Sequence, residues 1–223
     1  MNKPYKYLDL ITACFAVILL VSNIVSSKIL VLGPFTFDGG TMLFPLSYIL
    51  GDVLTEVYGY KKTRRVIWTG FFLLLLAMLT IMLVGILPAA GDWQGQSAYE
   101  AILGLTSRII VASLVAYFAG EFINSYILAK LKIETQGRML WVRLLGSSVV
   151  GHFIDSAIFV MIAFAGVLEP GLLWVVLVSN YIFKLMVEVV LMPLTYRVVA
   201  RLKKAEDEDY FDYKTDFNPF KLK

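Results

Sequence analysis

The sequence has one cysteine and one histidine in 223 residues. A single cysteine, Cys14, cannot form an intramolecular disulfide, and the single histidine, His152, limits the metal sites and catalytic groupings that the chain can supply. The sequence also lacks a GxxxxGK[ST] phosphate loop, an HExxH zinc motif and a GxSxG nucleophile elbow. These absences exclude an ATPase of its own, and they predict a chain without metal, cofactor or catalytic residues.

Charge is also scarce, because only 17% of the residues are charged while 59% are hydrophobic. With a mean hydropathy of +0.75, the composition indicates an integral membrane protein. A helix needs about 20 apolar residues to cross the hydrocarbon layer. The apolar runs predict an all-α domain over residues 1–204 and a cytoplasmic acidic and aromatic tail over residues 205–223, either mobile or lying on the membrane surface. The six expected spans are Leu8–Ser27, Thr41–Tyr58, Val66–Leu87, Ile102–Ala129, Met139–Ala165 and Leu172–Ala200.

Basic residues are missing from every second connection between these spans. Residues 33–40, 88–100 and 166–171 contain no Lys or Arg, whereas the N-terminus, residues 59–65, residues 130–143 and the segment from Arg197 contain 17 of the 20. Positive loops stay in the cytoplasm, so both termini are expected there. The other three bases, Lys28, Arg108 and Lys184, have no role in topology and need another explanation.

The charged side chains inside the expected spans include Asp52, Glu56, Arg108, Glu121, Asp155, Lys184 and Glu188. Each would cost about 3 kcal/mol at the centre of an isolated membrane helix. Such groups are therefore expected to face one another, a water-filled cavity or a ligand.

Three local patterns leave alternatives open. Asp52 and Glu56 share one helix face at i, i+4 spacing, which fits an inner polar gate or protonation site, or else a pair that reaches the interface beside Arg64 and Arg65. Lys184 recurs with Asn180 and Glu188 at the same spacing, which fits a ligand site or an internal Lys184–Glu188 ion pair. Residues 28–40 fit a hairpin or flap, or an ordinary interfacial loop.

The fifth span carries a second polar patch, in which Ser148, His152 and Ser156 share a face and Asp155 follows His152 by three residues. Small residues at Ala112, Ala116 and Gly120 allow close helix packing, within one bundle or across a homodimer.

Taken together, these features resemble one family. The resemblance is carried by Ser22-Asn23, the run FDGGTMLFPLSYILGDVLTEVYG with Arg64-Arg65, Arg108 with Ala112-Ser113, Arg143 with Ser147, Gly151 to Asp155-Ser156, Tyr181 with Lys184, and FNPF near the C-terminus. It covers nearly the whole chain and is to the queuosine precursor transporters, also called the vitamin uptake transporter family. Two positions depart from the family pattern: His152 stands where Gln is usual, and Asn124 where Asp is common.

The resemblance implies a multi-pass protein of the bacterial inner membrane that imports 7-cyano-7-deazaguanine or 7-aminomethyl-7-deazaguanine for queuosine synthesis in tRNA modification. It also implies an architecture like the substrate-binding subunits of energy-coupling-factor transporters, but with no ATPase partner and no nucleic acid partner. The alternatives are a vitamin-binding subunit of an ATP-driven importer and, from another class, an intramembrane enzyme using Asp52 and Glu56.

A deazaguanine presents an N–H beside an exocyclic amine and a carbonyl, which a carboxylate and a cationic or amide donor can bind. Asp155 is the expected carboxylate, Lys184, Arg108 and Asn23 are the expected donors, and aromatic rings are expected to stack on the ligand. The full predicted substrate site is Asn23, Arg108, His152, Asp155, Ser156, Asn180 and Lys184, and the predicted coupling or gating residues are Asp52, Glu56 and Glu188.

Overall fold

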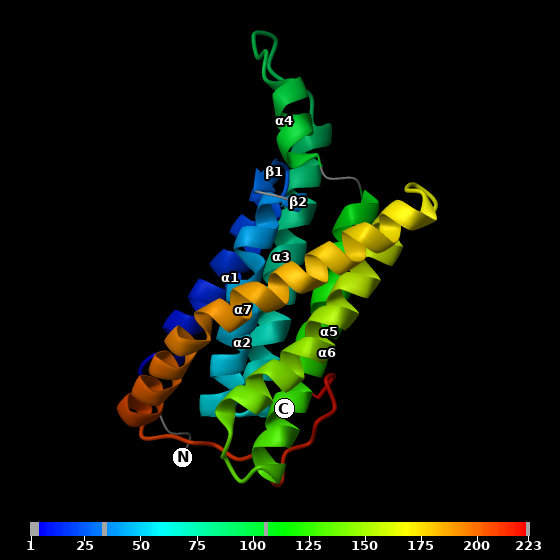
Figure 1. Cartoon of the computed structure of the whole chain (residues 1–223). Helices are drawn as coiled ribbons and strands as arrows, with labels where there is room; N and C mark the ends of the chain where they lie inside the picture. The colour runs from blue at the N-terminus through cyan, green and yellow to red at the C-terminus, as the bar shows by residue number, and fades with distance from the viewer. Residues whose placement is uncertain (1–4, 33–34, 105–106, 222–223) are drawn as a thin grey trace.

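The computed structural model describes residues 5–32, 35–104 and 107–221, and most of these residues are helical (Figure 1). The elements in chain order are α1 (Leu8–Val25), β1 (Ile29–Leu32), β2 (Phe35–Asp38), the 3-10 helix η1 (Gly39–Met42), α2 (Phe44–Tyr58), α3 (Tyr60–Ile86), α4 (Gln96–Leu103), α5 (Ser107–Glu134), α6 (Leu140–Phe164) and α7 (Pro170–Glu206). We call the end where α1 begins and α7 ends the termini end, and the opposite end, with β1 and β2, the hairpin end.

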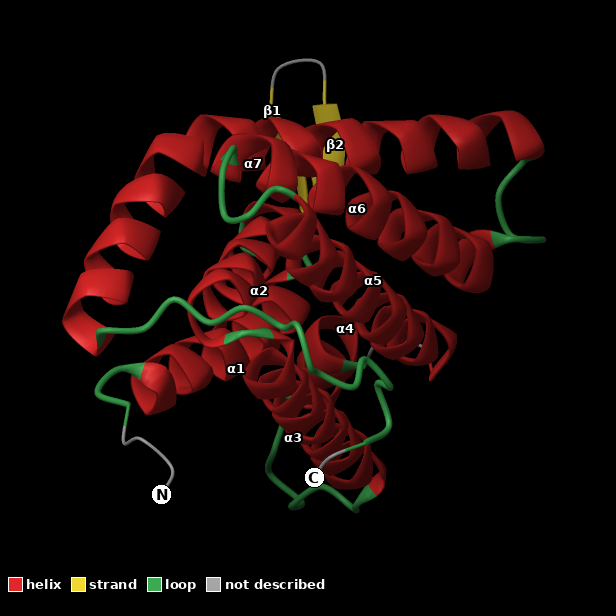
Figure 2. Cartoon of the chain, turned by 90° about the horizontal axis from the view of Figure 1, so that it is seen from below, coloured by secondary structure: helices red, strands yellow, loops and turns green. Residues whose placement is uncertain are grey.

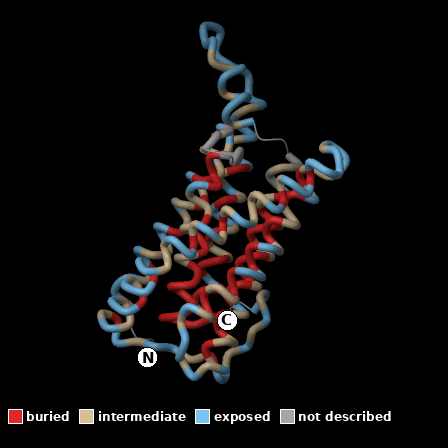
Figure 3. Tube along the Cα trace, viewed as in Figure 1, coloured by how far each residue is buried: buried red, intermediate tan, exposed pale blue. Residues whose placement is uncertain are grey.

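Within the described residues, five helices are long and apolar enough to cross a membrane: α1, α3, α5, α6 and α7. The predicted class, a helical integral membrane protein, is thereby supported. The second expected span differs from the prediction, because it starts with η1 and continues as a helix of only 15 residues. At about 1.5 Å per residue, α2 is shorter than the hydrocarbon layer, and the other helices bury most of its side chains (Figure 3).

The fourth expected span is also different. The prediction began one helix at Ile102, whereas the structure has the short helix α4 ending at Leu103, Gly104 after it, and α5 starting at Ser107. No residue of α4 is buried, and the helix projects from the hairpin end (Figure 1). Two hydrogen bonds link it to α3: the Tyr99 hydroxyl donates to the carbonyl of Ile81 at 2.9 Å, and the Gln96 side-chain amide donates to the carbonyl of Gly85 at 3.1 Å.

Residues 29–38 form an antiparallel pair of strands, which confirms the hairpin interpretation of this segment, although Gly33 and Pro34 lie outside the described residues. The register pairs Ile29 with Asp38 and Leu32 with Phe35. The chain then turns tightly against the end of α1, because a side chain at Gly39 would place its Cβ 2.4 Å from the carbonyl oxygen of Val25. The hairpin thus fixes where α2 enters the bundle.

Helices α5 and α6 approach each other closely through glycine. A Cβ at Gly120 would lie 2.7 Å from the Cβ of Asp155 and 3.1 Å from the carbonyl of Gly151. The small residues Ala112 and Ala116 are also buried inside the bundle. This packing brings the polar face of α6 against α5 and α2.

The C-terminal segment, residues 207–221, is held against the bundle, which differs from the expectation of a mobile tail. They run back across the helix ends at the termini end (Figure 2). Asp212 accepts a hydrogen bond from the Tyr60 amide at 3.0 Å, Arg64 donates to the carbonyl of Asp216 at 2.8 Å, and Trp68 donates to the carbonyl of Pro219 at 2.8 Å. The expected boundary at residue 204 falls inside α7, which continues to Glu206.

Candidate functional site

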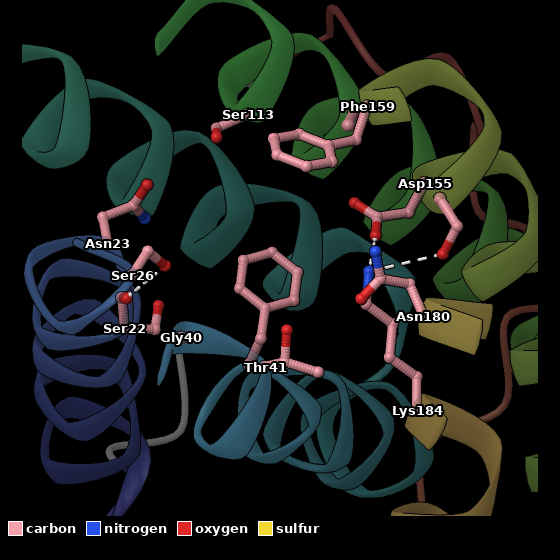
Figure 4. A pocket seen from close by; sticks show the side chains of 13 residues that line it. Ser22, Asn23, Ser26, Gly40, Thr41, Ser113, Asp155, Phe159, Asn180 and Lys184 are labelled. Carbon is pink, nitrogen blue, oxygen red and sulfur yellow. Dashed lines mark hydrogen bonds and ion pairs between the residues drawn. The ribbon is translucent and has the colours of Figure 1, made fainter. Parts of the chain in front are cut away.

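A pocket lies in the half of the bundle nearer the hairpin end, between α1, η1, α2, α5, α6 and α7. The empty space at this site, including its open mouth, is about 520 Å³. Its polar lining is Ser22, Asn23, Ser26, Thr41, Ser113, Asp155, Ser156, Asn180 and Lys184, and its aromatic lining is Phe44 and Phe159 (Figure 4). Five of the predicted substrate-site residues are therefore brought together, from three helices.

An ion pair joins α6 and α7 at this pocket. The Nζ of Lys184 contacts Oδ2 of Asp155 and lies 3.4 Å from the hydroxyl of Ser156. The ammonium also lies 5.1 Å from the centre of the Phe44 ring. Both charged side chains are almost fully buried, so the pair compensates two charges that would each be costly to desolvate alone. The alternative pairing of Lys184 with Glu188 is wrong.

Glu188 belongs to a second polar group, deeper in the bundle than the pocket. Its carboxylate accepts a hydrogen bond from the Ser148 hydroxyl at 2.5 Å and lies 2.8 Å from Nε2 of His152. The His152 ring packs on the Tyr48 ring with centroids 4.3 Å apart. His152 was predicted to contact substrate, but the structure places it outside the pocket lining, as the partner of Glu188.

Asp52 and Glu56 lie one helical turn apart on α2 but have different surroundings. Asp52 accepts a hydrogen bond from the side-chain amide of Asn124 at 2.7 Å. An Asp at residue 124 would put a second acid beside Asp52, whereas Asn supplies a neutral donor. This contact gives a physical role to one of the two departures from the family pattern.

Glu56 is the centre of a buried ion cluster near the termini end. Arg143 donates two hydrogen bonds to its carboxylate, at 2.9 and 3.2 Å, and Lys203 donates a third at 2.6 Å. Lys132 donates to the backbone carbonyl of Glu56 at 2.5 Å. Glu56 is fully buried and meets neither Arg64 nor Arg65, so the interfacial alternative for this residue is wrong.

The C-terminal segment joins this cluster through Asp209, whose Oδ1 lies 2.5 Å from Nζ of Lys132 and 2.8 Å from Nζ of Lys203. Burial alone would raise the pKa of Asp209, but the hydrogen bonds from the two lysines outweigh it and hold the pKa below its ordinary value. The cluster therefore ties α2, α5, α6, α7 and the C-terminal segment together.

Of the remaining predicted substrate-site residues, two lie at the pocket and one is described only by its backbone. The side chain of Asn23 lines the pocket and donates to the carbonyl of Leu19 at 2.9 Å, and Asn180 lines the pocket on α7. Arg108 is in the first turn of α5, but its side chain lies outside the described residues. The sequence analysis treated Lys132 and Lys203 only as topology signals and missed their contacts with Glu56. An acid within an expected span needs basic partners, and that need was the one signal for these two lysines.

Comparisons with known proteins agree with a multi-pass membrane protein. A family model described as "putative vitamin uptake transporter" matches residues 38–198. A "probable queuosine precursor transporter" of Bacillus subtilis is 32% identical over 162 residues, which cover 70% of this chain and 69% of that protein. The "queuosine precursor transporter" of Escherichia coli is 26% identical over 213 residues, 93% of each chain.

A third relative, a "probable queuosine precursor transporter" of Haemophilus influenzae, is 26% identical over 166 residues, covering 73% of this chain and 68% of the relative. No solved structure matches the chain. The resemblance identified from the sequence is confirmed, and the names of the family and of these relatives are those of transporters, which supports a role other than catalysis.

Proposed function

The chain belongs to the vitamin uptake transporter family, and we propose that it imports a queuosine precursor, 7-cyano-7-deazaguanine or 7-aminomethyl-7-deazaguanine, across the bacterial cytoplasmic membrane. The relatives that are named for this substrate match up to 93% of the chain. In this proposal the chain acts as a secondary transporter and needs no ATPase partner.

The observation that carries the proposal is the contact between Asp155 and Lys184 in the pocket. On one edge of a deazaguanine, the exocyclic amine, the ring N–H and the carbonyl follow one another. The carboxylate accepts from the amine and the N–H, and the adjacent ammonium donates to the carbonyl. A carboxylate and an ammonium that already touch therefore match consecutive groups of this edge.

The other lining residues suit the rest of a flat heterocycle. Phe44 and Phe159 supply aromatic surface for its faces, and Asn23, Ser156 and Asn180 supply donors and acceptors at its rim. A ligand that left the buried pair unsatisfied would lose about 1–3 kcal/mol per unpaired group, which would give the site its selectivity. His152 acts indirectly in this proposal, by holding Glu188 below the pocket.

For transport, we place the hairpin end outside the cell and both termini in the cytoplasm, with α2 as the sixth crossing, in an arrangement like the substrate-binding subunits of energy-coupling-factor transporters. The pocket then opens outward, and the Glu56 cluster closes the inner side. Release of substrate to the cytoplasm requires α2 and α6 to separate there, so Glu56 and Arg143 form the inner gate. Asp52 and Glu188 lie between the pocket and this gate.

The enzyme alternative receives no support from these surroundings. An intramembrane catalyst would need Asp52 and Glu56 to face a space that admits substrate. Instead, neither residue lines the pocket described above, and Glu56 is neutralised by Arg143 and Lys203.

The test is counterflow with the purified chain alone in liposomes. Vesicles loaded with unlabelled 7-cyano-7-deazaguanine should take up the labelled compound, because a self-sufficient carrier exchanges substrate without ATP. Uptake should be absent in protein-free vesicles. No exchange by folded protein would refute transport by the chain alone, and exchange that appeared only after adding an ATPase module would favour the ATP-driven importer.

A further inference from the structure

Glu121, in the middle of α5, is a buried acid without a partner. Its side chain has no exposed surface, and neither carboxyl oxygen has a hydrogen-bond partner in the structure. No ion pair within the described part of the chain includes it. Of the other in-span acids, Asp155 pairs with Lys184, Glu188 with His152 and Glu56 with Arg143, while Asp52 accepts a hydrogen bond from the neutral amide of Asn124.

The carboxyl group lies directly against the backbone of α2. A Cβ at Gly51 would be 1.8 Å from Oε1 of Glu121, so a residue with any side chain could not occupy residue 51 in this arrangement. The glycine therefore creates the space that the acid occupies.

The ionisable groups around Glu121 are acids and tyrosines. Asp52 on α2, Asp155 on α6 and Glu188 on α7 are near enough to interact electrostatically with its carboxyl group. The same holds for Tyr48 on α2 and Tyr117 on α5. The Tyr117 hydroxyl donates to the carbonyl of Ile67 at 3.1 Å and so does not serve Glu121. Helix α3 has no ionisable side chain after Arg65.

An ionised carboxylate in these surroundings would carry a large desolvation cost, which no nearby base offsets. The neutral, protonated acid does not carry that cost. The bases in this part of the bundle cannot help, since Lys184 and His152 are already paired with Asp155 and Glu188. The geometry therefore favours a proton on Glu121 in this arrangement.

We propose that Glu121 binds the proton that is carried inward with the substrate. This inference deepens the proposed function and rests on it. The site is close to the substrate pocket, because a Cβ at the neighbouring Gly120 would be 2.3 Å from the Tyr48 hydroxyl and 2.7 Å from the Cβ of Asp155, which lines the pocket. Tyr48 is fully buried, and its hydroxyl has no hydrogen-bond partner among the described residues.

In this structure Glu121 favours binding of the proton, because its carboxyl group is shielded from water and has no base as an ion-pair partner. Opening of the inner gate would separate α2 from α6 and admit water to the face of α2 that covers Glu121. Hydration stabilises the ionised carboxylate, so the proton leaves to the cytoplasm. The proton thus binds in the outward-open state and leaves in the inward-open state.

The first experiment uses Glu121→Gln, which keeps the shape of the neutral acid, and Glu134→Gln, an exposed position on the same helix, as the matched control. In liposomes with an acidic exterior, wild type and the control should accumulate 7-cyano-7-deazaguanine above the external concentration and acidify an internal pH dye when substrate is added. Glu121→Gln should do neither, while substrate exchange stays detectable. Gradient-driven accumulation by Glu121→Gln at the wild-type level would overturn the proposal, as would wild-type uptake that does not rise above the external concentration under the gradient.

The second experiment needs no transport. At neutral pH the infrared spectrum of wild-type protein should contain the carbonyl stretch of a protonated carboxylic acid, and Glu121→Gln should lack that band. Identical spectra for the two proteins would overturn the proposal. If liposomes exchange no substrate at all, the proposed function fails, and this spectrum still decides whether Glu121 holds a proton.

Discussion

The ammonium of Lys184 on α7 contacts the carboxylate of Asp155 on α6, rather than that of Glu188 one turn along its own helix. Glu188 is instead bound by Ser148 and His152. The polar residues of α6 and α7 are thereby divided into a pair that faces the pocket and a group that lies behind it. The predictions below follow from this division and from the contacts at the termini end.

Removing the charge of Lys184 should destabilise the protein. Lys184→Met leaves Asp155 buried without its counter-ion, which costs about 3–5 kcal/mol when a buried pair loses one partner. The double variant Lys184→Met/Asp155→Asn should recover part of this loss, because no buried charge remains. Thermal unfolding in detergent measures both. A single variant as stable as wild type would show that the ion pair does not form.

The Glu56 cluster should contribute to stability more than any surface charge. Glu56→Gln leaves Arg143 buried with a neutral partner, and a loss of about 3 kcal/mol is expected. Glu134→Gln, at an exposed position on α5, is the control and should change stability by less than about 0.5 kcal/mol. Chemical unfolding that gave both variants the same stability would contradict the buried cluster.

Loss of the contact between Asp212 and Tyr60 is expected to loosen the C-terminal segment and so to change the fluorescence of Trp68. Asp212→Ala removes the acceptor for the Tyr60 amide and for the Thr215 hydroxyl, and should cost about 1–3 kcal/mol. Proteolysis after residue 206 should become faster, and Trp68 emission should shift to the red as Pro219 leaves its indole. Lys214→Ala, which alters an exposed neighbour, should do neither. Equal proteolysis rates for the two variants would indicate that the segment is not held by Asp212.

The pKa of Asp209 predicts an acid-sensitive contribution to stability. Because the folded-state pKa lies below the ordinary value, the contribution is fully present above the unfolded-state pKa of about 4 and is lost as the pH falls from there through the lowered value. The difference in melting temperature between wild type and Asp209→Asn should therefore be constant near neutrality and shrink in acid. A difference that grew on acidification would have the wrong sign for this contact.

Much of the fold could be predicted because a lipid environment restricts the choices. Long apolar runs must form helices, and the distribution of Lys and Arg identifies which connections share a side. The hairpin could be predicted from two β-prone runs around Gly33-Pro34. The short length of α2 could not be predicted, because its residues look like part of a span in the sequence. Only the packed structure shows that the other helices bury them.

The pairing of charges could not be predicted in the same way. Spacing along α7 permits a Lys184–Glu188 pair, and only the packing of α6 against α7 places Asp155 closer to Lys184. Lys132 and Lys203 were read as topology signals, since nothing in the sequence shows that α5 and α7 bring them to Glu56. The burial of Glu121 without an ion-pair partner depends on Gly51, seventy residues earlier in the chain, because the missing side chain there leaves space for the carboxyl group.

The most direct test of the account is calorimetric binding of 7-cyano-7-deazaguanine to purified wild type and Asp155→Asn, with Asp92→Asn, at an exposed loop position, as the control. Wild type and Asp92→Asn should bind the compound with the same affinity. Asp155→Asn should bind about 10- to 100-fold more weakly, because losing a hydrogen bond to a charged group costs about 1.5–3 kcal/mol. Unchanged affinity in a folded Asp155→Asn variant would contradict the pocket as the substrate site.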